Sequence, residues 1–238
     1  AGGDALRPLF DAARAAFATT AAAIEGYGPA FEAFGGPAPA PRFAQDWFPG
    51  LDAAALYATV RAARPRRIVE IGSGHSTRIT ARAIADGGLD TELVAVDPAP
   101  RAALAGLAVS WQRRPVQAMA PEPVAALEAG DVLVVDSSHV LVDGSDVAFV
   151  FTELLPRLRA GVLLHVHDVF LPDPYPAAWA WRGYNEQPAV AGLLTGGFEL
   201  VFASAFVRRH APELLGPVAR ALPLPAGAFE TSLWLRRC

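Results

Sequence analysis

The feature that most constrains the fold is an apolar run that ends in a glycine turn and continues as a helix. Residues 67–77 read Arg-Ile-Val-Glu-Ile-Gly-Ser-Gly-His-Ser-Thr, so a short strand meets Gly72 and Gly74 just before a helix start. A second apolar run, residues 93–97, closes in Asp97. A strand, a glycine turn and a helix, followed about 20 residues later by a carboxylate, are typical of a site for an adenosine-containing ligand. The pattern therefore predicts both an α/β architecture and a class of ligand.

Apolar strands alternate with helices over most of the chain, which predicts a parallel sheet covered on both faces. We expect strands near 67–71, 92–97, 108–112, 131–136 and 161–167. Helices are expected near 51–64, 75–86, 99–106, 121–129 and 146–159. Residues 198–204 and 231–236 read as two more strands around a proline-rich segment, and predict an antiparallel pair at a sheet edge. Residues 4–34 read as one or two amphipathic helices, followed by a linker of glycines and prolines at 35–41.

A chain of 238 residues is long enough for one α/β domain with an added cap. We assign residues 1–50 to a helical N-terminal extension and residues 51–238 to the ligand-binding domain. Hydrophobic residues make up 53% and charged residues 18%, which favours a folded globular protein over disorder. The net charge of -4 gives no reason to expect a nucleic-acid partner. The chain has no lysine, which excludes Schiff-base and lysine-base chemistry.

The single cysteine, Cys238, excludes an internal disulfide and a cysteine nucleophile. No apolar run reaches the ~20 residues that span a bilayer, so we expect no membrane partner. The start of the sequence lacks the pattern of a signal peptide, and we therefore expect a cytoplasmic enzyme. The apolar N-terminal helices leave a homodimer open.

Polar side chains gather at the ends of two later strands. One buried strand ends in Asp136-Ser-Ser-His139, at the carboxyl edge where open α/β sheets bind ligands. The next strand contains His165 and His167, which share one face because side chains alternate along a strand. Asp168 follows, where a turn can direct it back towards the cleft. His165 is equally consistent with a hydrogen-bonded core histidine.

Three of these residues, Asp136, His167 and Asp168, admit two interpretations. They could hold a divalent cation, and the histidine favours Mn²⁺, Fe²⁺ or Zn²⁺ over Mg²⁺. They could equally form a general-base relay, with His139, His167 and Asp168 as the candidate catalytic residues. The proline-rich loop at 171–176 and the aromatic residues that follow it form either an acceptor pocket or an anchor to the core.

These motifs resemble those of the class I S-adenosylmethionine-dependent methyltransferases. Residues 70–76, Glu-Ile-Gly-Ser-Gly-His-Ser, look like the first motif of that class, and Asp97 looks like its ribose-binding acid. More narrowly, residues 136–139, 165–172 and 184–187 look like a bacterial subgroup, methyltransferase family 24. That subgroup is similar to the macrocin and cephalosporin-pathway O-methyltransferases. The resemblance extends from about residue 50 onwards and implies a Rossmann-like, seven-stranded, mostly parallel sheet whose last strand is antiparallel.

The resemblance implies methyl transfer from S-adenosylmethionine to a small-molecule acceptor, chiefly to a hydroxyl oxygen. It implies that the glycine turn binds the methionine portion, Asp97 the ribose and the loop at 117–119 the adenine. The residues expected to bind the cofactor are Glu70, Gly72, Ser73, Gly74, Ser76, Asp97, Pro98, Ala118, Asp136 and Ser137. In catechol-type relatives a metal lies at the positions of Asp136, His167 and Asp168, and the base is a lysine. Here His139 or His167 would have to supply that base.

Two other functions stay open on the sequence alone. A nicotinamide-dependent oxidoreductase is disfavoured because Thr77 stands where a dinucleotide site has a third glycine, and because a lysine-free chain has no Tyr-x-x-x-Lys pair. A non-catalytic nucleotide-binding module is disfavoured because it would need none of the histidines and aspartates at the strand ends.

Overall fold

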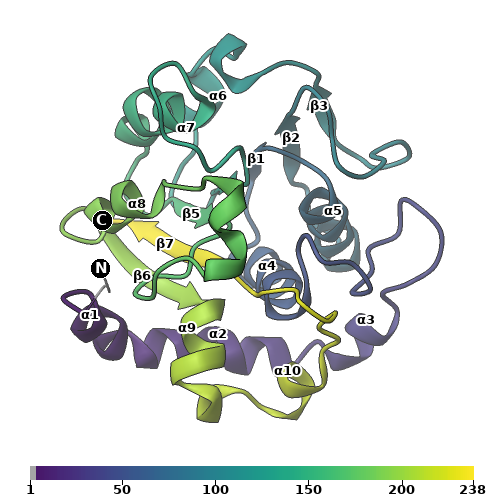
Figure 1. Ribbon diagram of the computed structural model, residues 1–238. Coiled ribbons are helices and arrows are strands. Elements are labelled where there is room, and N and C mark those ends of the chain that lie inside the picture. The colour runs from purple at the N-terminus through teal and green to yellow at the C-terminus, as the bar shows by residue number, and fades with distance from the viewer. Residues whose placement is uncertain (1–3) are drawn as a thin grey trace.

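Seven strands form one mixed sheet in the computed structural model, which describes residues 4–238. They are β1 (Arg67–Ile71), β2 (Glu92–Val96), β3 (Ser110–Gln112), β4 (Val132–Val135), β5 (Leu163–Val166), β6 (Phe198–Ala203) and β7 (Leu233–Arg237). Their order across the sheet is β3-β2-β1-β4-β5-β7-β6 (Figure 1). Strands β1 to β5 pair in parallel, whereas β7 runs antiparallel to both of its neighbours, β5 and β6. The predicted sheet, with its reversed last strand, is confirmed.

The central strands are continuous apolar runs because both of their faces are covered. Every residue of β4 and β5 is buried, as are the last four residues of β1 and β2. The short edge strand β3 keeps two of its three residues exposed. The four strands that carry the site are therefore fixed by packing on both sides.

Ten α-helices are found among the described residues: α1 (Arg7–Ala12), α2 (Arg14–Glu25), α3 (Gly28–Glu32), α4 (Gly50–Ala63), α5 (His75–Gly87), α6 (Glu122–Ala125), α7 (Asp146–Phe149), α8 (Gln187–Leu193), α9 (Ser204–His210) and α10 (Pro217–Ala221). Helices α2, α4 and α5 lie on one side of the sheet, and α6, α7 and α8 lie on the other (Figure 1). Helix α7 continues as a π-helix over Val150–Leu154 and a 3₁₀ turn over Leu155–Arg157, so helical backbone covers most of the predicted segment 146–159.

Three helix predictions need correction. Residues 99–106 form turns, because Ala99 N–H donates to the Asp97 carboxylate and Arg101 N–H donates to the carbonyl of Ser73. The helix predicted at 121–129 shrinks to α6, because the Asp131 carboxylate accepts the N–H of Glu128 and closes a turn. Residues 4–34 form three helices rather than one or two.

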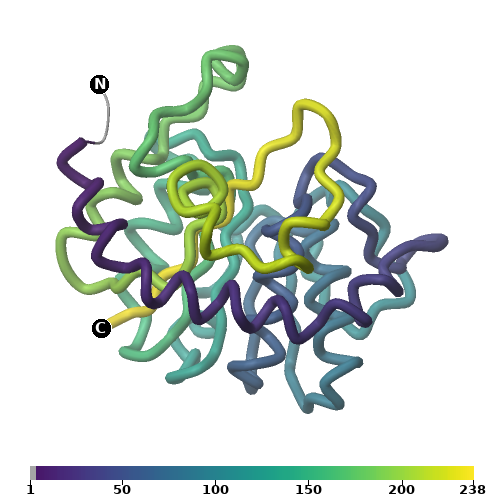
Figure 2. The backbone as a smooth tube through the Cα atoms, turned by 90° about the horizontal axis from the view of Figure 1, so that it is seen from below, coloured from purple at the N-terminus to yellow at the C-terminus, as the bar shows by residue number. Residues whose placement is uncertain are grey.

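The N-terminal helices share the core of the sheet. Helices α1 to α3 run across α9 and α10 along one side of the molecule (Figure 2). The ring of Phe17 in α2 lies 6.3 Å from that of Phe202 in β6 and 5.6 Å from that of Phe206 in α9. Phe10, Phe17 and the strand residues belong to one buried cluster. The domain boundary at residue 50 stays a prediction.

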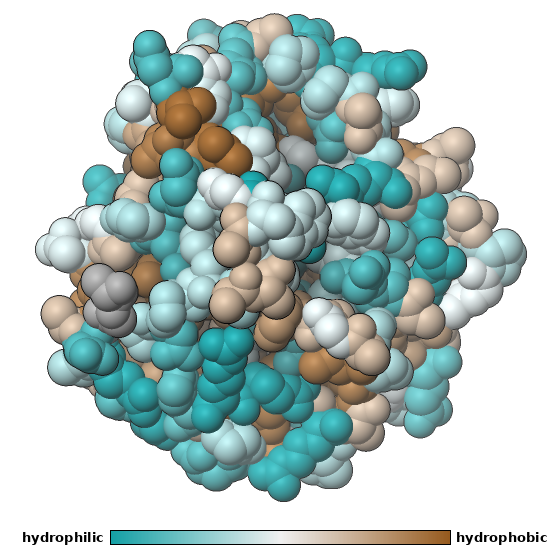
Figure 3. All heavy atoms as spheres, in the orientation of Figure 1, coloured by the Kyte–Doolittle hydropathy of each residue, from teal (hydrophilic) through white to brown (hydrophobic). Residues whose placement is uncertain are grey.

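Apolar side chains reach the surface only in separate areas on the face drawn in Figure 3, surrounded by hydrophilic ones. Within residues 4–238 there is no helix with the length and hydropathy of a membrane span.

Candidate active site

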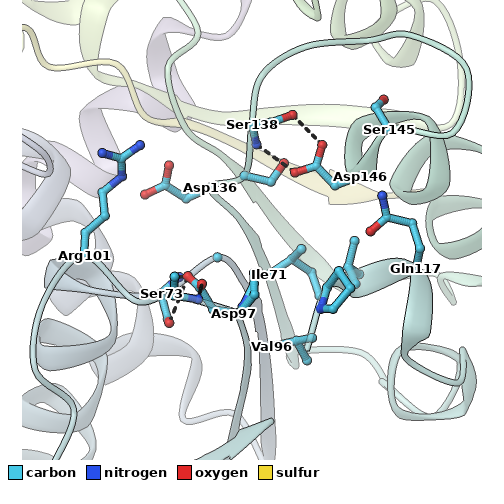
Figure 4. A pocket seen from close by; sticks show the side chains of 16 residues that line it. Ile71, Ser73, Val96, Asp97, Arg101, Gln117, Asp136, Ser138, Ser145 and Asp146 are labelled. Atoms are coloured by element: carbon cyan, nitrogen blue, oxygen red, sulfur yellow. Dashed lines mark hydrogen bonds between the residues drawn. The ribbon is translucent and has the colours of Figure 1, made fainter. Parts of the chain in front are cut away.

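The strand order reverses between β1 and β4, and ligands of open α/β sheets bind at this point beyond the carboxyl ends of the strands. A cavity of about 630 Å³ opens there (Figure 4). Six of the residues expected to bind the cofactor line it: Gly72, Ser73, Asp97, Pro98, Asp136 and Ser137. The other four, Glu70, Gly74, Ser76 and Ala118, lie outside its lining.

Gly72 shapes the floor of the cavity. Its φ is +82°, and a Cβ there would lie 1.7 Å from the carbonyl oxygen of Asp136, so only glycine fits between the ends of β1 and β4. The next residue, Ser73, donates its N–H to Oδ2 of Asp97 over 2.7 Å. Ala99 N–H donates to Oδ1 of Asp97, also over 2.7 Å. The hydroxyl of Ser73 also donates to Oδ2 over 3.2 Å. Asp97 thus fixes the turn and can still bind a diol, because Oδ1 can accept a second hydrogen bond and the Ser73 hydroxyl can rotate away from Oδ2.

The first turn of helix α5 is capped by a side chain of the helix itself. The side chain of Thr77 accepts the N–H of Gly74 over 2.9 Å, which removes one of the free donors that a phosphate would use. Glu70, at the end of β1, is fully buried and accepts a 2.5 Å hydrogen bond from the hydroxyl of Ser76. Its other oxygen has no partner among the described residues. Burial raises the pKa of Glu70 to about 8.

Five further polar side chains line the cavity: Arg101, Gln117, Ser138, Ser145 and Asp146. Sequence reasoning pointed to the loop of Gln117 and to the motif that contains Ser138, and missed the other three. At one end of the cavity, Asp146 accepts the N–H of Ser138 over 2.9 Å and also its hydroxyl (Figure 4). The capping signal of Ser145, whose side chain accepts Ala148 N–H at the start of α7, could have identified this end. Arg101 points to the same side of the cavity as Asp136 (Figure 4).

His139 lies behind Asp136 and is surrounded by carboxylates. Its Nε2 is 3.4 Å from Oδ1 of Asp136 and 3.4 Å from Oδ2 of Asp168. Its Nδ1 is 2.6 Å from Oε1 of Glu186. Although burial opposes a charge, these partners raise the pKa of His139 well above its usual range and favour the imidazolium. When they carry a positive charge, His167 and His139 hold the pKa of Asp136 far below its usual range, against the effect of its burial.

His139 and Asp168 both have left-handed backbone, with φ of 60° and 55°. Non-glycine residues rarely adopt this conformation, and where they do they concentrate at functional sites. The strain coincides with the side chains that the sequence singled out at the two strand ends.

His167 lies beside this group, stacked on Phe48 with ring centroids 4.6 Å apart. Its Nδ1 is 3.6 Å from Oδ1 of Asp136 and 3.6 Å from Oδ1 of Asp168. Its Nε2 is 3.2 Å from Oδ2 of Asp52, a fully buried residue of α4. Sequence reasoning missed Asp52, because it stands in an apolar helix remote from every strand-end motif.

His165 belongs to the core. It is fully buried against Trp234, and its Nε2 lies 2.9 Å from the hydroxyl of Ser232. Burial lowers the pKa of His165 well below its usual range, so it is neutral. It does not line the cavity.

Across the part of the chain that the structure describes, no three His, Cys, Asp or Glu side chains are arranged to hold a metal ion. The predicted metal set of Asp136, His167 and Asp168 is therefore not supported. The physical reason is that His139 already supplies a positive charge between the two carboxylates.

The segment after β5 is held to this cluster by its backbone. Asn185 N–H donates to the carbonyl of His139, and Leu141 N–H donates to the Asn185 side chain over 2.6 Å. The ring of Tyr184 lies 4.6 Å from that of His139. Part of the aromatic loop thus adjoins the site, while Trp179 packs against Phe170 of the core.

A protein-family model described as a methyltransferase domain, that of methyltransferase family 24, matches residues 69–169. The sequence matches no curated protein. Among solved structures, the O-methyltransferase TomG from Streptomyces achromogenes, involved in tomaymycin synthesis and solved in complex with S-adenosylmethionine, shares 19% identity. The match covers 90% of this chain and 89% of that one, with a TM-score of 0.50, and shows a common fold. Methyltransferase PaMTH1 of Podospora anserina, solved with S-adenosylhomocysteine, matches at 18% identity over 91% and 88%, with a TM-score of 0.48.

Proposed function

We propose that the chain, whose residues 69–169 match the methyltransferase domain of family 24, is a class I S-adenosylmethionine-dependent methyltransferase that methylates a hydroxyl oxygen of a small molecule. The observation that carries the proposal is the contact between the cavity and the buried histidine cluster. Asp136 lines the cavity with 27% of its side chain exposed, and His167 lies directly behind it. The site proposed for the methyl donor and the proton acceptor His167 thus adjoin each other at Asp136.

The cavity is proposed to hold S-adenosylmethionine along its length. One ribose hydroxyl donates to Oδ1 of Asp97, and the other donates to Oδ2 in place of the Ser73 hydroxyl. The methionine portion lies at Gly72 and Ser73. The adenine lies towards Gln117 and Asp146, where side-chain polar groups line the other end. The cofactor roles of Glu70, Gly74, Ser76 and Ala118 stay predictions, and these residues would act from behind the lining.

The reaction forms a bond between the acceptor oxygen and the methyl carbon while the bond between that carbon and sulfur breaks. The sulfonium supplies the activation, so the protein must position the hydroxyl and remove its proton. We assign the positioning to the Asp136 carboxylate, which accepts the hydroxyl hydrogen bond. The proton then passes to Nδ1 of His167, 3.6 Å from the same carboxylate oxygen; such contacts tighten when substrate binds.

Of the three candidate catalytic residues, His167 is the base in this proposal. His139 is an unsuitable base because its raised pKa keeps it protonated at neutral pH. We assign to His139 and Asp168 the task of fixing the charges around Asp136. No step of the proposed reaction uses a metal ion.

Calorimetry with S-adenosylmethionine, followed by a methyl-transfer assay on a panel of small phenols, alcohols and amines, tests the proposal. We expect micromolar cofactor binding, formation of S-adenosylhomocysteine and O-methylated product. Asp136→Asn should lower turnover at least 100-fold and leave cofactor affinity within a few fold, because the amide lacks the negative charge that holds the hydroxyl and stabilises the proton arriving on His167. The control is Asp143→Asn, an exposed carboxylate of the same loop that lies outside the cavity lining. Binding of NAD in place of S-adenosylmethionine, or methylation of amines alone, would overturn the proposal.

A further inference from the structure

Asp52 is the most heavily hydrogen-bonded carboxylate near the site, although nothing in the motifs points to it. It lies in the first turn of α4 and has no exposed surface. Its oxygens accept the N–H of Thr231 over 2.8 and 3.0 Å and the N–H of Ser232 over 2.9 Å. The hydroxyl of Ser204 donates to Oδ1 over 2.5 Å. The remaining partner is Nε2 of His167, at 3.2 Å from Oδ2.

The donors around Asp52 decide which ring nitrogen of His167 carries hydrogen. Backbone N–H groups can only donate, and the Ser204 oxygen already accepts Ser232 N–H over 2.8 Å, so its own hydrogen is directed to Asp52. An ionised carboxylate can only accept. The N–H groups of Thr231 and Ser232 and the hydroxyl of Ser204 all point their hydrogens at Asp52 and favour its ionised form. Nε2 of His167 must therefore present an N–H to Asp52.

A neutral imidazole with hydrogen on Nε2 has its lone pair on Nδ1. That lone pair faces Oδ1 of Asp136 and Oδ1 of Asp168, each 3.6 Å away. The hydroxyl of Thr231 donates to Oδ1 of Asp168 over 3.0 Å, so one of these oxygens is already partly satisfied. Stacking on Phe48 fixes the plane of the ring. A hydrogen-bond donor is what this arrangement lacks, and an acceptor hydroxyl is such a donor.

From this geometry we propose that Asp52 is the positioning residue of the reaction, holding His167 in the tautomer whose Nδ1 is free to take the proton of the acceptor. The inference rests on the proposed function. In the step itself the O–H proton moves to Nδ1 as the carbon–oxygen bond forms and the carbon–sulfur bond breaks. His167 then carries hydrogen on both nitrogens, and the Asp52 carboxylate offsets the new positive charge until the proton leaves to solvent.

The decisive variant is Asp52→Asn. The amide oxygen can accept the same N–H and O–H groups, which turns the NH₂ group towards Nε2 of His167. Nε2 must then accept, the hydrogen moves to Nδ1, and the base is lost. We expect kcat to fall by roughly 10²- to 10⁴-fold, as for an inverted catalytic histidine, while the Kd for S-adenosylmethionine stays within a few fold.

The ¹⁵N chemical shifts of the His167 ring report the tautomer directly, independently of activity. The wild-type protein should show a protonated Nε2 and an unprotonated Nδ1, and Asp52→Asn should show the reverse. Ser204→Ala is the matched control, because it removes a donor to Asp52 but leaves the carboxylate facing His167. Its tautomer should stay that of the wild type, and its kcat should change by no more than about three-fold.

Several results would overturn the inference. One is unchanged turnover in Asp52→Asn; another is an equal loss in Asp52→Asn and Ser204→Ala with no change of tautomer. If Asp52→Asn does not fold, hydrogen on Nδ1 of His167 in the wild-type protein at neutral pH would by itself contradict it. Failure of the proposed function looks different, because the wild-type protein would then bind no S-adenosylmethionine whatever the tautomer.

Discussion

Gly72 is the residue at which the sequence motif and the site geometry coincide most closely. Replacing it with alanine puts a Cβ 1.7 Å from the carbonyl oxygen of Asp136, at a φ of +82° that side chains rarely adopt. We expect Gly72→Ala to lower the free energy of unfolding by roughly 3 kcal/mol or more, and to weaken S-adenosylmethionine binding because β1 and β4 must separate. Urea denaturation and calorimetry measure the two effects.

Gly130→Ala is the control for this substitution. Gly130 has a similar φ of +89°, but its added Cβ would meet nothing within 4 Å. It should cost about 1 kcal/mol from backbone strain alone and leave cofactor affinity unchanged. Equal losses of stability in the two variants would show that the close approach of β1 and β4 contributes nothing.

Glu70 makes the stability of the cofactor-free protein depend on pH. Burial raises its folded-state pKa from 4.5 to about 8, so the folded chain binds the proton more tightly than the unfolded chain. The stabilisation is complete below pH 4.5 and is lost as the pH rises to about 8. Glu70→Gln mimics the protonated form, so its free energy of unfolding should not decline over this pH range. At pH 8 that free energy should exceed the wild-type value by a few kcal/mol, the order of magnitude that the pKa shift implies. Denaturation at pH 5 and pH 8 measures the free energy of unfolding of both proteins. An equal decline between these pH values in Glu70→Gln and in the wild type would contradict this explanation.

The residues that sequence reasoning found differ from those that it missed in how far along the chain their partners lie. Gly72 and Asp97 were predictable because their partners lie in adjoining strand–turn–helix units of regular spacing. Asp52 was not, because its partner Thr231 stands 179 positions away and no local pattern links them. Glu186 lies in a motif that the sequence analysis named, but its contact with His139, 47 positions away, was not predictable, because the segment after the next strand, β5, brings it there.

At the scale of elements, all seven strands were predictable because burial on both faces leaves unmistakable apolar runs in the central ones. Helices were predicted less well. The segment 99–106 has the composition of a helix, but its backbone N–H groups bind Asp97 and the glycine turn instead. Composition cannot reveal such a competition, since it depends on where the turn lies in space.

Helix α2 offers a test of how far the N-terminal helices share the core. Phe17 is fully buried against the rings of Phe202 and Phe206, so Phe17→Ala should destabilise the whole protein by about 3–5 kcal/mol in a single transition. Thr19→Ala, on the exposed side of the same helix, should change stability by less than about 0.5 kcal/mol. Thermal unfolding measures both variants. If Phe17→Ala destabilised only a separate, earlier unfolding transition, the N-terminal helices would be an independent extension.

At the scale of the whole molecule, the charges of the site are balanced by side chains. His139 lies between Asp136 and Asp168 where the sequence had suggested a cation. We therefore expect dialysis against EDTA to leave the rate of methyl transfer unchanged, and added Mg²⁺ or Mn²⁺ to produce no stimulation beyond about two-fold. Loss of activity on chelation, restored by one of these ions, would contradict this prediction.

The strand order also governs when the site can become complete during synthesis. Strand β7 follows β6 in the chain but lies between β6 and β5 in the sheet. A nascent chain leaving the ribosome can therefore assemble β1 to β5 with the cofactor cavity, while Phe198–Ala203 has no strand to pair with until residues 233–237 emerge. Thr231 and Ser232, which hold Asp52, emerge just before them. Cofactor binding should thus be acquired earlier on the ribosome than the ability to orient His167.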